Sequence, residues 1–107
     1  MKTLDEYQKI VKKIAQEFNF NWITYIQFIH LVEEVGELGE ALTVKEEDRQ
    51  MGSGEKAQAD HGNIEEEFGD VLFTLMELAN KYNISLSKMM DDTFKRYEVK
   101  LQKIKNE

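Results

Sequence analysis

The chain of 107 residues contains no cysteine and no proline, and each absence restricts what it can be. Without cysteine, the protein can form neither disulfide bonds nor a metal site built on thiolates. Without proline, nothing in the sequence forces a helix to kink or to end. All six glycines lie between Gly36 and Gly69. These absences favour long uninterrupted helices over a sheet with many tight turns.

Long apolar runs and an excess of basic residues are also missing. No run is apolar over the length that a membrane-spanning helix needs, and the chain does not begin with the charged-then-apolar leader of a secreted protein. We therefore expect a cytoplasmic protein that does not enter a membrane. With 21 acidic and 14 basic residues, the net charge is −7, which disfavours binding to the phosphates of a nucleic-acid polymer. A small phosphorylated ligand remains compatible if a metal ion bridges the two sets of negative charge.

Apolar residues recur at helical spacing in four segments, which predicts a single all-α domain over residues 1–107. The first segment begins at Thr3, which forms a capping-box pattern with Glu6, and reaches about residue 18. The others cover about 22–44, 63–82 and 86–103. Between the second and third helices lies a polar stretch, about 45–62, which we expect to be a long solvated loop. The pattern predicts four helices in a bundle-like arrangement.

Two short acidic motifs, one in the second helix and one in the third, are near copies of each other. They read Glu33-Glu34-Val35-Gly36-Glu37-Leu38 and Glu66-Glu67-Phe68-Gly69-Asp70-Val71. In each motif the second and third acids share a helix face, and like charges at that spacing oppose helix formation. Four converging carboxylates are usually compensated by a hard divalent cation. The repeated motifs therefore predict a metal site.

Each motif belongs to a polar stripe with apolar residues on both sides, which predicts that the stripes are partly buried. The stripes are Gln27, His30, Glu34 and Glu37 on the second helix, and Asn63, Glu67, Asp70, Thr74 and Glu77 on the third. We assign the core face of the second helix to Phe28, Leu31, Val32, Val35, Leu38 and Leu42. If the helices pack antiparallel through their apolar faces, the stripes meet along one edge. Glu77, at the far end of its stripe, we assign to solvent.

Glycine recurs at the same register in both motifs, as Gly36 and Gly69. A glycine inside a helix costs about 1 kcal/mol relative to alanine. Its repetition at matching positions predicts that a neighbouring helix approaches closely at both.

With these motifs the chain resembles the MazG-like nucleoside triphosphate pyrophosphohydrolases of the all-α NTP pyrophosphatase superfamily. The family pattern is Glu-Glu-x-x-Glu, a spacer and Glu-x-x-Asp, and the similarity covers about residues 25–97. The resemblance implies hydrolysis of a nucleoside triphosphate between its α and β phosphates, to a monophosphate and pyrophosphate, in house-cleaning of the nucleotide pool. It implies Mg²⁺, with Mn²⁺ as a substitute, on Glu34, Glu37, Glu67 and Asp70. Glu33 is the candidate catalytic residue that orients the attacking water.

Four further residues are candidates for binding the substrate. The family often has a Lys-aromatic-x-x-Arg segment on its last helix; here the two bases are exchanged, as Arg96 and Lys100, which would suit phosphate but also complement the helix dipole. Trp22 could stack on a nucleobase, although a lone tryptophan at a helix start is more often a core anchor. His30 could contact the substrate, or simply be a partly buried, hydrogen-bonded histidine.

Two alternatives to a nucleoside triphosphate pyrophosphohydrolase stay open. One is an enzyme like the phosphoribosyl-ATP pyrophosphohydrolases, with the same fold and metal. The other is a non-catalytic helical module that binds metal or a partner, in which the four carboxylates would not converge. A di-iron bundle is excluded because it needs Glu-x-x-His pairs, and residues 27 and 58 are glutamines. The resemblance also implies a homo-oligomer, a dimer or tetramer, with active sites near subunit contacts.

Overall fold

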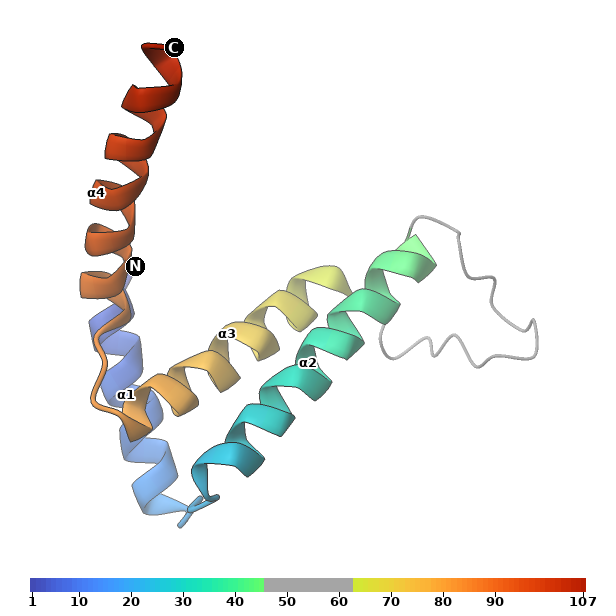
Figure 1. The fold of residues 1–107 in the computed structure, drawn as a ribbon. Coiled ribbons are helices and arrows are strands. Elements are labelled where there is room, and N and C mark those ends of the chain that lie inside the picture. Colours follow the sequence, from blue (N-terminus) through green and yellow to red (C-terminus); the bar gives the residue numbers. More distant parts are fainter. Residues whose placement is uncertain (46–62) are drawn as a thin grey trace.

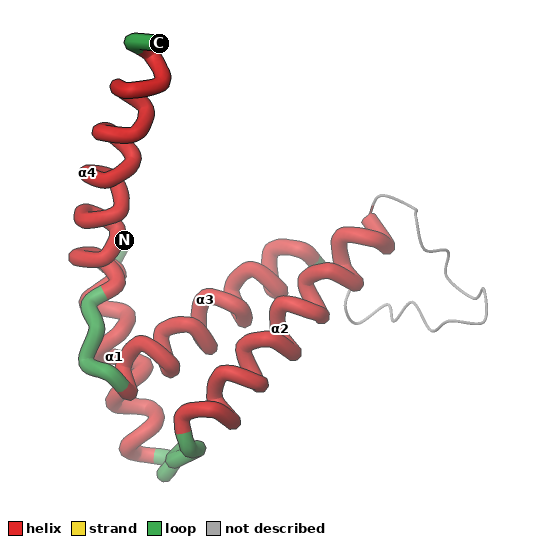
Figure 2. Tube along the Cα trace, in the orientation of Figure 1, coloured by secondary structure: helices red, strands yellow, loops and turns green. Residues whose placement is uncertain are grey.

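The computed structural model describes residues 1–45 and 63–107. Almost all of the predicted polar loop, from residue 46 to 62, therefore lies outside the described residues. The helices are α1 (Leu4–Glu17), α2 (Thr24–Lys45), α3 (Ile64–Lys81) and α4 (Leu86–Lys105). The described residues contain no strand (Figure 2), which confirms the predicted all-α class. None of the helices in these two ranges combines the length and apolarity needed to cross a membrane.

Local sequence signals account for where the helices begin and end. Thr3 and Glu6 form the predicted capping box, with hydrogen bonds of 3.0 and 3.1 Å between each side chain and the other residue's backbone N–H. The side chains of Asn63 and Ser85 cap α3 and α4 by accepting backbone N–H groups. After α1 and after α3, an asparagine adopts a positive φ, a conformation that asparagine tolerates better than most residues.

The helices α2 and α3 lie side by side and antiparallel, and they make the most extensive contact between elements (Figure 1). Helix α1 packs against α3, and α4 contacts chiefly α1. From there α4 projects away from the α2–α3 pair (Figure 1), and none of its residues is buried. The site that α2 and α3 form is therefore flanked by α1 and not by α4 of the same chain.

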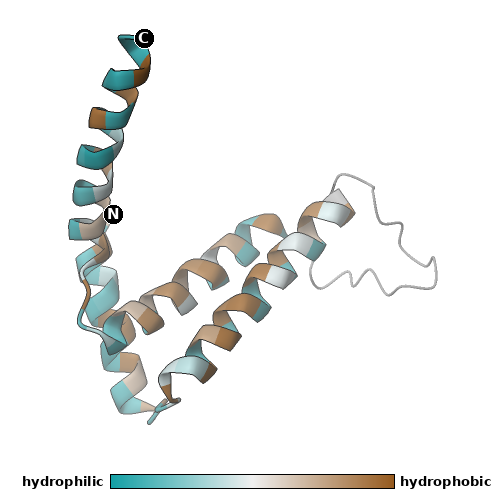
Figure 3. Ribbon diagram, viewed as in Figure 1, coloured by the Kyte–Doolittle hydropathy of each residue, from teal (hydrophilic) through white to brown (hydrophobic). Residues whose placement is uncertain are grey.

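The contact between α2 and α3 buries the polar stripes themselves, and this corrects the predicted packing. Gln27 and Glu67 are only 3% and 4% exposed, and Ala41 and Thr74 are also buried. The predicted core face of α2 lies largely on the surface, since Phe28, Val32, Val35 and Leu42 are all exposed. The physical reason is that α2 carries apolar residues on more than one side (Figure 3), so its periodicity alone does not select the side that meets α3.

The predicted close approach of a helix at the repeated glycines is also wrong within the single chain. A Cβ atom placed on Gly36, Gly39 or Gly69 would meet no atom within 4 Å. These glycines face away from the α2–α3 contact, because that contact uses the polar stripes.

A buried glutamine joins α1 to the connection between α3 and α4. Gln8 is 6% exposed, and its Nε2 donates to Asn80 Oδ1 (3.1 Å) and to the carbonyl of Ile84 (2.8 Å). Its Oε1 accepts the backbone N–H of Leu86 at 2.9 Å. In return, Nδ2 of Asn80 donates to the backbone carbonyl of Gln8. These bonds satisfy backbone groups at the chain reversal and fix where α4 begins.

Replacing Gln8 by alanine should lower the free energy of unfolding by about 2 kcal/mol or more, because the Ile84 carbonyl and the Leu86 N–H lose their partner. Urea unfolding followed by circular dichroism measures this change. The matched control is Gln16→Ala, an exposed position of the same helix. Equal stability losses in the two variants would show that the Gln8 hydrogen bonds add little.

Candidate metal centre and adjoining pocket

Three carboxylates from the two acidic motifs converge where α2 and α3 meet. One oxygen each of Glu34, Glu67 and Asp70 lies within 4.8 Å of the other two. The helical spacing of each motif places its acids on one face, and the antiparallel contact brings those faces together. The structure therefore brings together three of the four residues predicted to bind metal.

The cluster is unevenly exposed to water, and its charges oppose one another. Glu67 is buried, the Glu34 side chain is 16% exposed, and Asp70 is exposed. Burial raises the pKa of Glu34, as do a hydrogen bond with Glu37 and the negative charges of Glu37 and Asp70, while His30 acts in the opposite direction. Without a counter-charge, ionising all of these groups together is unfavourable.

A hard divalent cation fits this arrangement. Carboxylate oxygens are the ligands that Mg²⁺ prefers, at about 2.1 Å, so two ligands of one ion lie up to about 4 Å apart. The oxygens of the cluster are close to that spacing, and small side-chain rotations would close the difference. Oε2 of Glu34 is also buried without a hydrogen-bond partner. A cation at this point would satisfy that oxygen and offset the repulsion.

The predicted fourth ligand, Glu37, lies one turn along α2, close enough to Glu34 to raise the pKa of its carboxyl. It is not among the three residues whose oxygens converge. Glu33 is exposed and does not line the pocket described below.

His30 continues the acidic stripe and links it to Trp22. Nε2 of His30 lies 3.1 Å from Oε1 of Glu34, and Nδ1 is buried without a hydrogen-bond partner. The rings of Trp22 and His30 meet edge to face, with centroids 5.0 Å apart. Because Trp22 is 50% exposed, it is not the buried core anchor that a lone tryptophan often provides.

A pocket of about 290 Å³ adjoins the acid cluster and runs along the seam between α2 and α3. Three aromatic residues, two acids of the cluster and four other polar residues line it: Phe20, Trp22, Phe73, Glu34, Asp70, Gln27, His30, Thr74 and Glu77. It thus combines aromatic walls, which suit a planar ring, with a carboxylate-rich end. Trp22 and His30, two of the predicted substrate-binding residues, both lie in it.

Glu77 lines this pocket, although the sequence pattern assigned it to solvent. Burial raises the pKa of its carboxyl, while His30, the Gln27 amide and Lys81 favour the charged form. The signal was present in the sequence, because Glu77 follows Asp70 by two helical turns on the same stripe.

Arg96 and Lys100 do not lie at the acid cluster of their own chain. They line a separate hollow on α4, together with Thr93 and Tyr97, and α4 projects away from the α2–α3 pair (Figure 1). Within one chain, these two bases and the three acids do not form a single site.

Comparisons with known proteins show the family and the fold of the chain. Residues 25–104 match the family model of the MazG nucleotide pyrophosphohydrolase domain. The Bacillus subtilis protein YpjD is 30% identical over 100 residues, covering 92% of this chain and 86% of that protein. The crystal structure of YpjD from B. subtilis superposes with a TM-score of 0.74 at 31% identity, covering 91% of this chain and 94% of that one. The crystal structure of a Bacillus-conserved MazG protein, a nucleotide pyrophosphohydrolase, gives a TM-score of 0.71 at 28% identity, covering 91% and 90%.

Addition of Mg²⁺ or Mn²⁺ should raise the melting temperature of the protein, because the cation binds the folded cluster. Glu67→Gln should weaken this binding by about tenfold or more, since it removes a charged ligand from the cluster. Thermal unfolding over a metal titration gives the affinities. Glu65→Gln, which removes an exposed charge from the same helix turn, should respond like the wild type. Identical metal responses in both variants would place the cation elsewhere.

Proposed function

Because the chain belongs to the MazG nucleotide pyrophosphohydrolase family, we propose that it hydrolyses nucleoside triphosphates between the α and β phosphates. The products are a nucleoside monophosphate and pyrophosphate, and the role is house-cleaning of the nucleotide pool in the cytoplasm. The observation that carries the proposal is the cluster of Glu34, Glu67 and Asp70 at one end of an aromatic pocket. The non-catalytic alternative is disfavoured, because it expects carboxylates that do not converge.

Mg²⁺ is the proposed cofactor, with Mn²⁺ as a substitute, and Glu34, Glu67 and Asp70 would hold it. When bound, it neutralises phosphate charge and lowers the pKa of a coordinated water. Glu37, one turn along α2 from Glu34, would supply a fourth ligand after a change of rotamer. Glu33, the residue before Glu34, is the proposed group that orients the attacking water.

The charges of the site set the direction in which the substrate binds. A triphosphate brings negative charge to a cluster that is itself negative, so it can approach the acids only together with a cation. The phosphates therefore lie at the Glu34 and Asp70 end of the pocket, and the nucleoside extends toward its aromatic walls. Trp22, half exposed at the wall, would stack on the base, and His30 would face the sugar or the α phosphate.

We also propose that the protein is a homo-oligomer, a dimer or tetramer. Many large apolar side chains are exposed on one side of α2 and along α4, and exposed apolar patches mark surfaces that bind a partner. On α4, Phe94 is 60% exposed, and Tyr97, Leu101 and Ile104 are similarly open. A second copy would cover these faces, and α4 of that copy could bring its Arg96 and Lys100 to the phosphates.

Turnover should require a divalent cation and the acid network. A pyrophosphate-release assay over canonical nucleoside triphosphates should give activity with Mg²⁺ and none with EDTA. Asp70→Asn and Glu37→Gln should each lower kcat/KM about a hundredfold or more, because several kcal/mol of transition-state stabilisation depend on the cation. Glu65→Gln and Glu40→Gln are the matched controls on α3 and α2. Absence of turnover in folded wild-type protein, on every nucleotide, would refute the proposed activity.

The oligomer should dissociate when a charge is placed on its apolar interface. Light scattering with size exclusion should give a dimer or tetramer mass for the wild type, and a lower mass or weaker association for Phe94→Asp, because burying an unpaired charge is unfavourable. Glu98→Asp on the same helix controls for a change at an exposed charged position. A monomeric wild type at micromolar concentration would contradict the proposal.

A further inference from the structure

Two polar residues face each other at the end of the pocket that lies farthest from the acid cluster. Gln27 precedes Glu34 by seven residues on α2, and Glu77 follows Asp70 by seven residues on α3. Because the helices are antiparallel (Figure 1), Gln27 and Glu77 lie toward the same end of the contact between α2 and α3. Seven residues span about 10 Å of helix, which is comparable with the length of a nucleoside. A nucleotide with its phosphates at the acids would place the edge of its base at Gln27 and Glu77.

The polar groups of this pair are buried and available to a ligand. Gln27 is 3% exposed, and its Nε2 has no hydrogen-bond partner of normal geometry. A buried amide donor without a partner is costly, and the residue lines the pocket. Glu77 is half-buried beside it; burial raises the pKa of its carboxyl, while His30, the Gln27 amide and Lys81 act in the opposite direction. The end of the pocket thus offers an N–H donor next to carboxylate acceptors.

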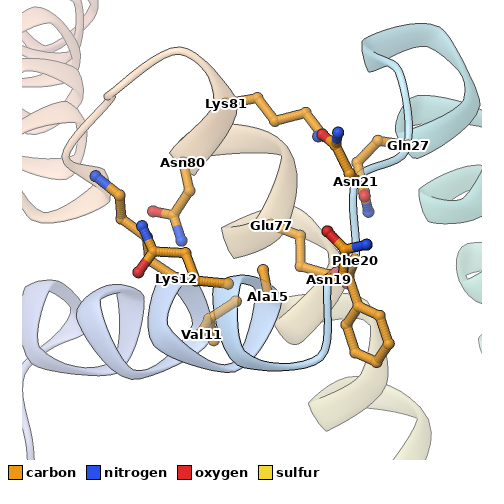
Figure 4. Close-up of a pocket in the computed structure, with 11 residues that line it drawn as sticks. Val11, Lys12, Ala15, Asn19, Phe20, Asn21, Gln27, Glu77, Asn80 and Lys81 are labelled. Carbon is orange, nitrogen blue, oxygen red and sulfur yellow. The ribbon is translucent and has the colours of Figure 1, made fainter.

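The same two residues separate this pocket from a second cavity. That cavity, of about 400 Å³, lies between the end of α1, the connection to α2 and the end of α3. Figure 4 shows Gln27 and Glu77 among its lining residues, with Lys81 and Lys12. Gln27 and Glu77, together with Phe20, therefore border open space on both sides.

We propose that Gln27 and Glu77 read the edge of the nucleobase and select bases that carry an exocyclic amino group, namely cytosine, adenine and guanine, over uracil and thymine. This inference rests on the proposed function and names the substrate class for that site. In cytosine and adenine, the amino N–H donates to the Glu77 carboxylate, and the adjacent ring nitrogen (N3 of cytosine or N1 of adenine) accepts the Gln27 Nε2–H. In guanine, N1–H and the amino group both donate to the carboxylate, and O6, next to N1, accepts the Gln27 Nε2–H. Stacking on the aromatic walls is tolerant of base identity. The selection between bases therefore depends on Gln27 and Glu77.

Uracil and thymine do not match the pair. Their O4 carbonyl takes the place of the amino group of cytosine, so it would set a second acceptor against the Glu77 carboxylate. Their single ring N–H lies between two carbonyl groups, so approaching it brings the carboxylate against one of those oxygens. Loss of one well-matched base contact typically lowers discrimination at least about tenfold.

The test compares CTP with UTP, which differ in the base only at position 4 and in the proton on N3. The wild-type kcat/KM with Mg²⁺ should be at least about tenfold higher for CTP. Glu77→Gln, which keeps the side-chain shape and adds a donor for O4, should bring the ratio close to one, mainly by lowering the CTP value. Gln27→Leu, which removes the buried donor, is a second variant that should also reduce the ratio. Glu65→Gln is the matched control and should keep the wild-type ratio.

Equilibrium binding of CMP and UMP, measured in parallel, gives the same comparison without turnover. Tighter binding of CMP that is lost in Glu77→Gln supports the inference. A wild-type ratio near one for both turnover and binding would overturn the selection while leaving the pyrophosphohydrolase activity intact. Absence of turnover on every nucleotide would instead refute the activity, and the binding ratio would then decide whether the pair recognises bases.

Discussion

The burial of carboxylates between two antiparallel helices is the constraint on which the rest of this structure depends. The α2–α3 contact covers Glu67 and most of Glu34, where an ordinary helix pair would bury aliphatic side chains. Burial and the nearby carboxylates raise the pKa of Glu34. The ionised carboxylates therefore repel one another at this contact, and a divalent cation would offset the repulsion. The same carboxylates thus weaken the α2–α3 contact and offer the ligands for a cation that would bind phosphate.

This seam also organises the pocket, because its two ends differ in chemistry. One end holds the acids of the cluster, and the other holds the uncharged amide of Gln27 beside the half-buried carboxyl of Glu77. Trp22 and His30 lie between them, joined by an edge-to-face contact. Helix α1 and its link to α2 line the second cavity beyond Gln27 and Glu77, and the Gln8 hydrogen bonds hold α1 against the end of α3. A ligand that is anionic at one end and planar at the other matches this polarity.

The use of polar stripes as the contact surface explains why so much apolar surface remains open. Phe28, Val32 and Val35 would form the core side of an ordinary amphipathic helix, but here they face outward with the glycines. Helix α4 adds a further uncovered apolar face. Association of copies, as proposed above, would bury these surfaces.

The all-α class, the capped helix starts at Thr3, Asn63 and Ser85, and the sharing of one helix face by the acids of each motif are set by the sequence alone. These follow from short-range rules, since caps and shared helix faces depend on residues three or four positions apart. The packing of the helices sets which side of α2 meets α3, and with it the convergence of Glu34, Glu67 and Asp70 and the position of Glu77 near Gln27. The packing also sets the direction in which α4 leaves the pair. Those outcomes depend on which of several apolar sides of α2 is covered, and helical periodicity carries no information on that choice.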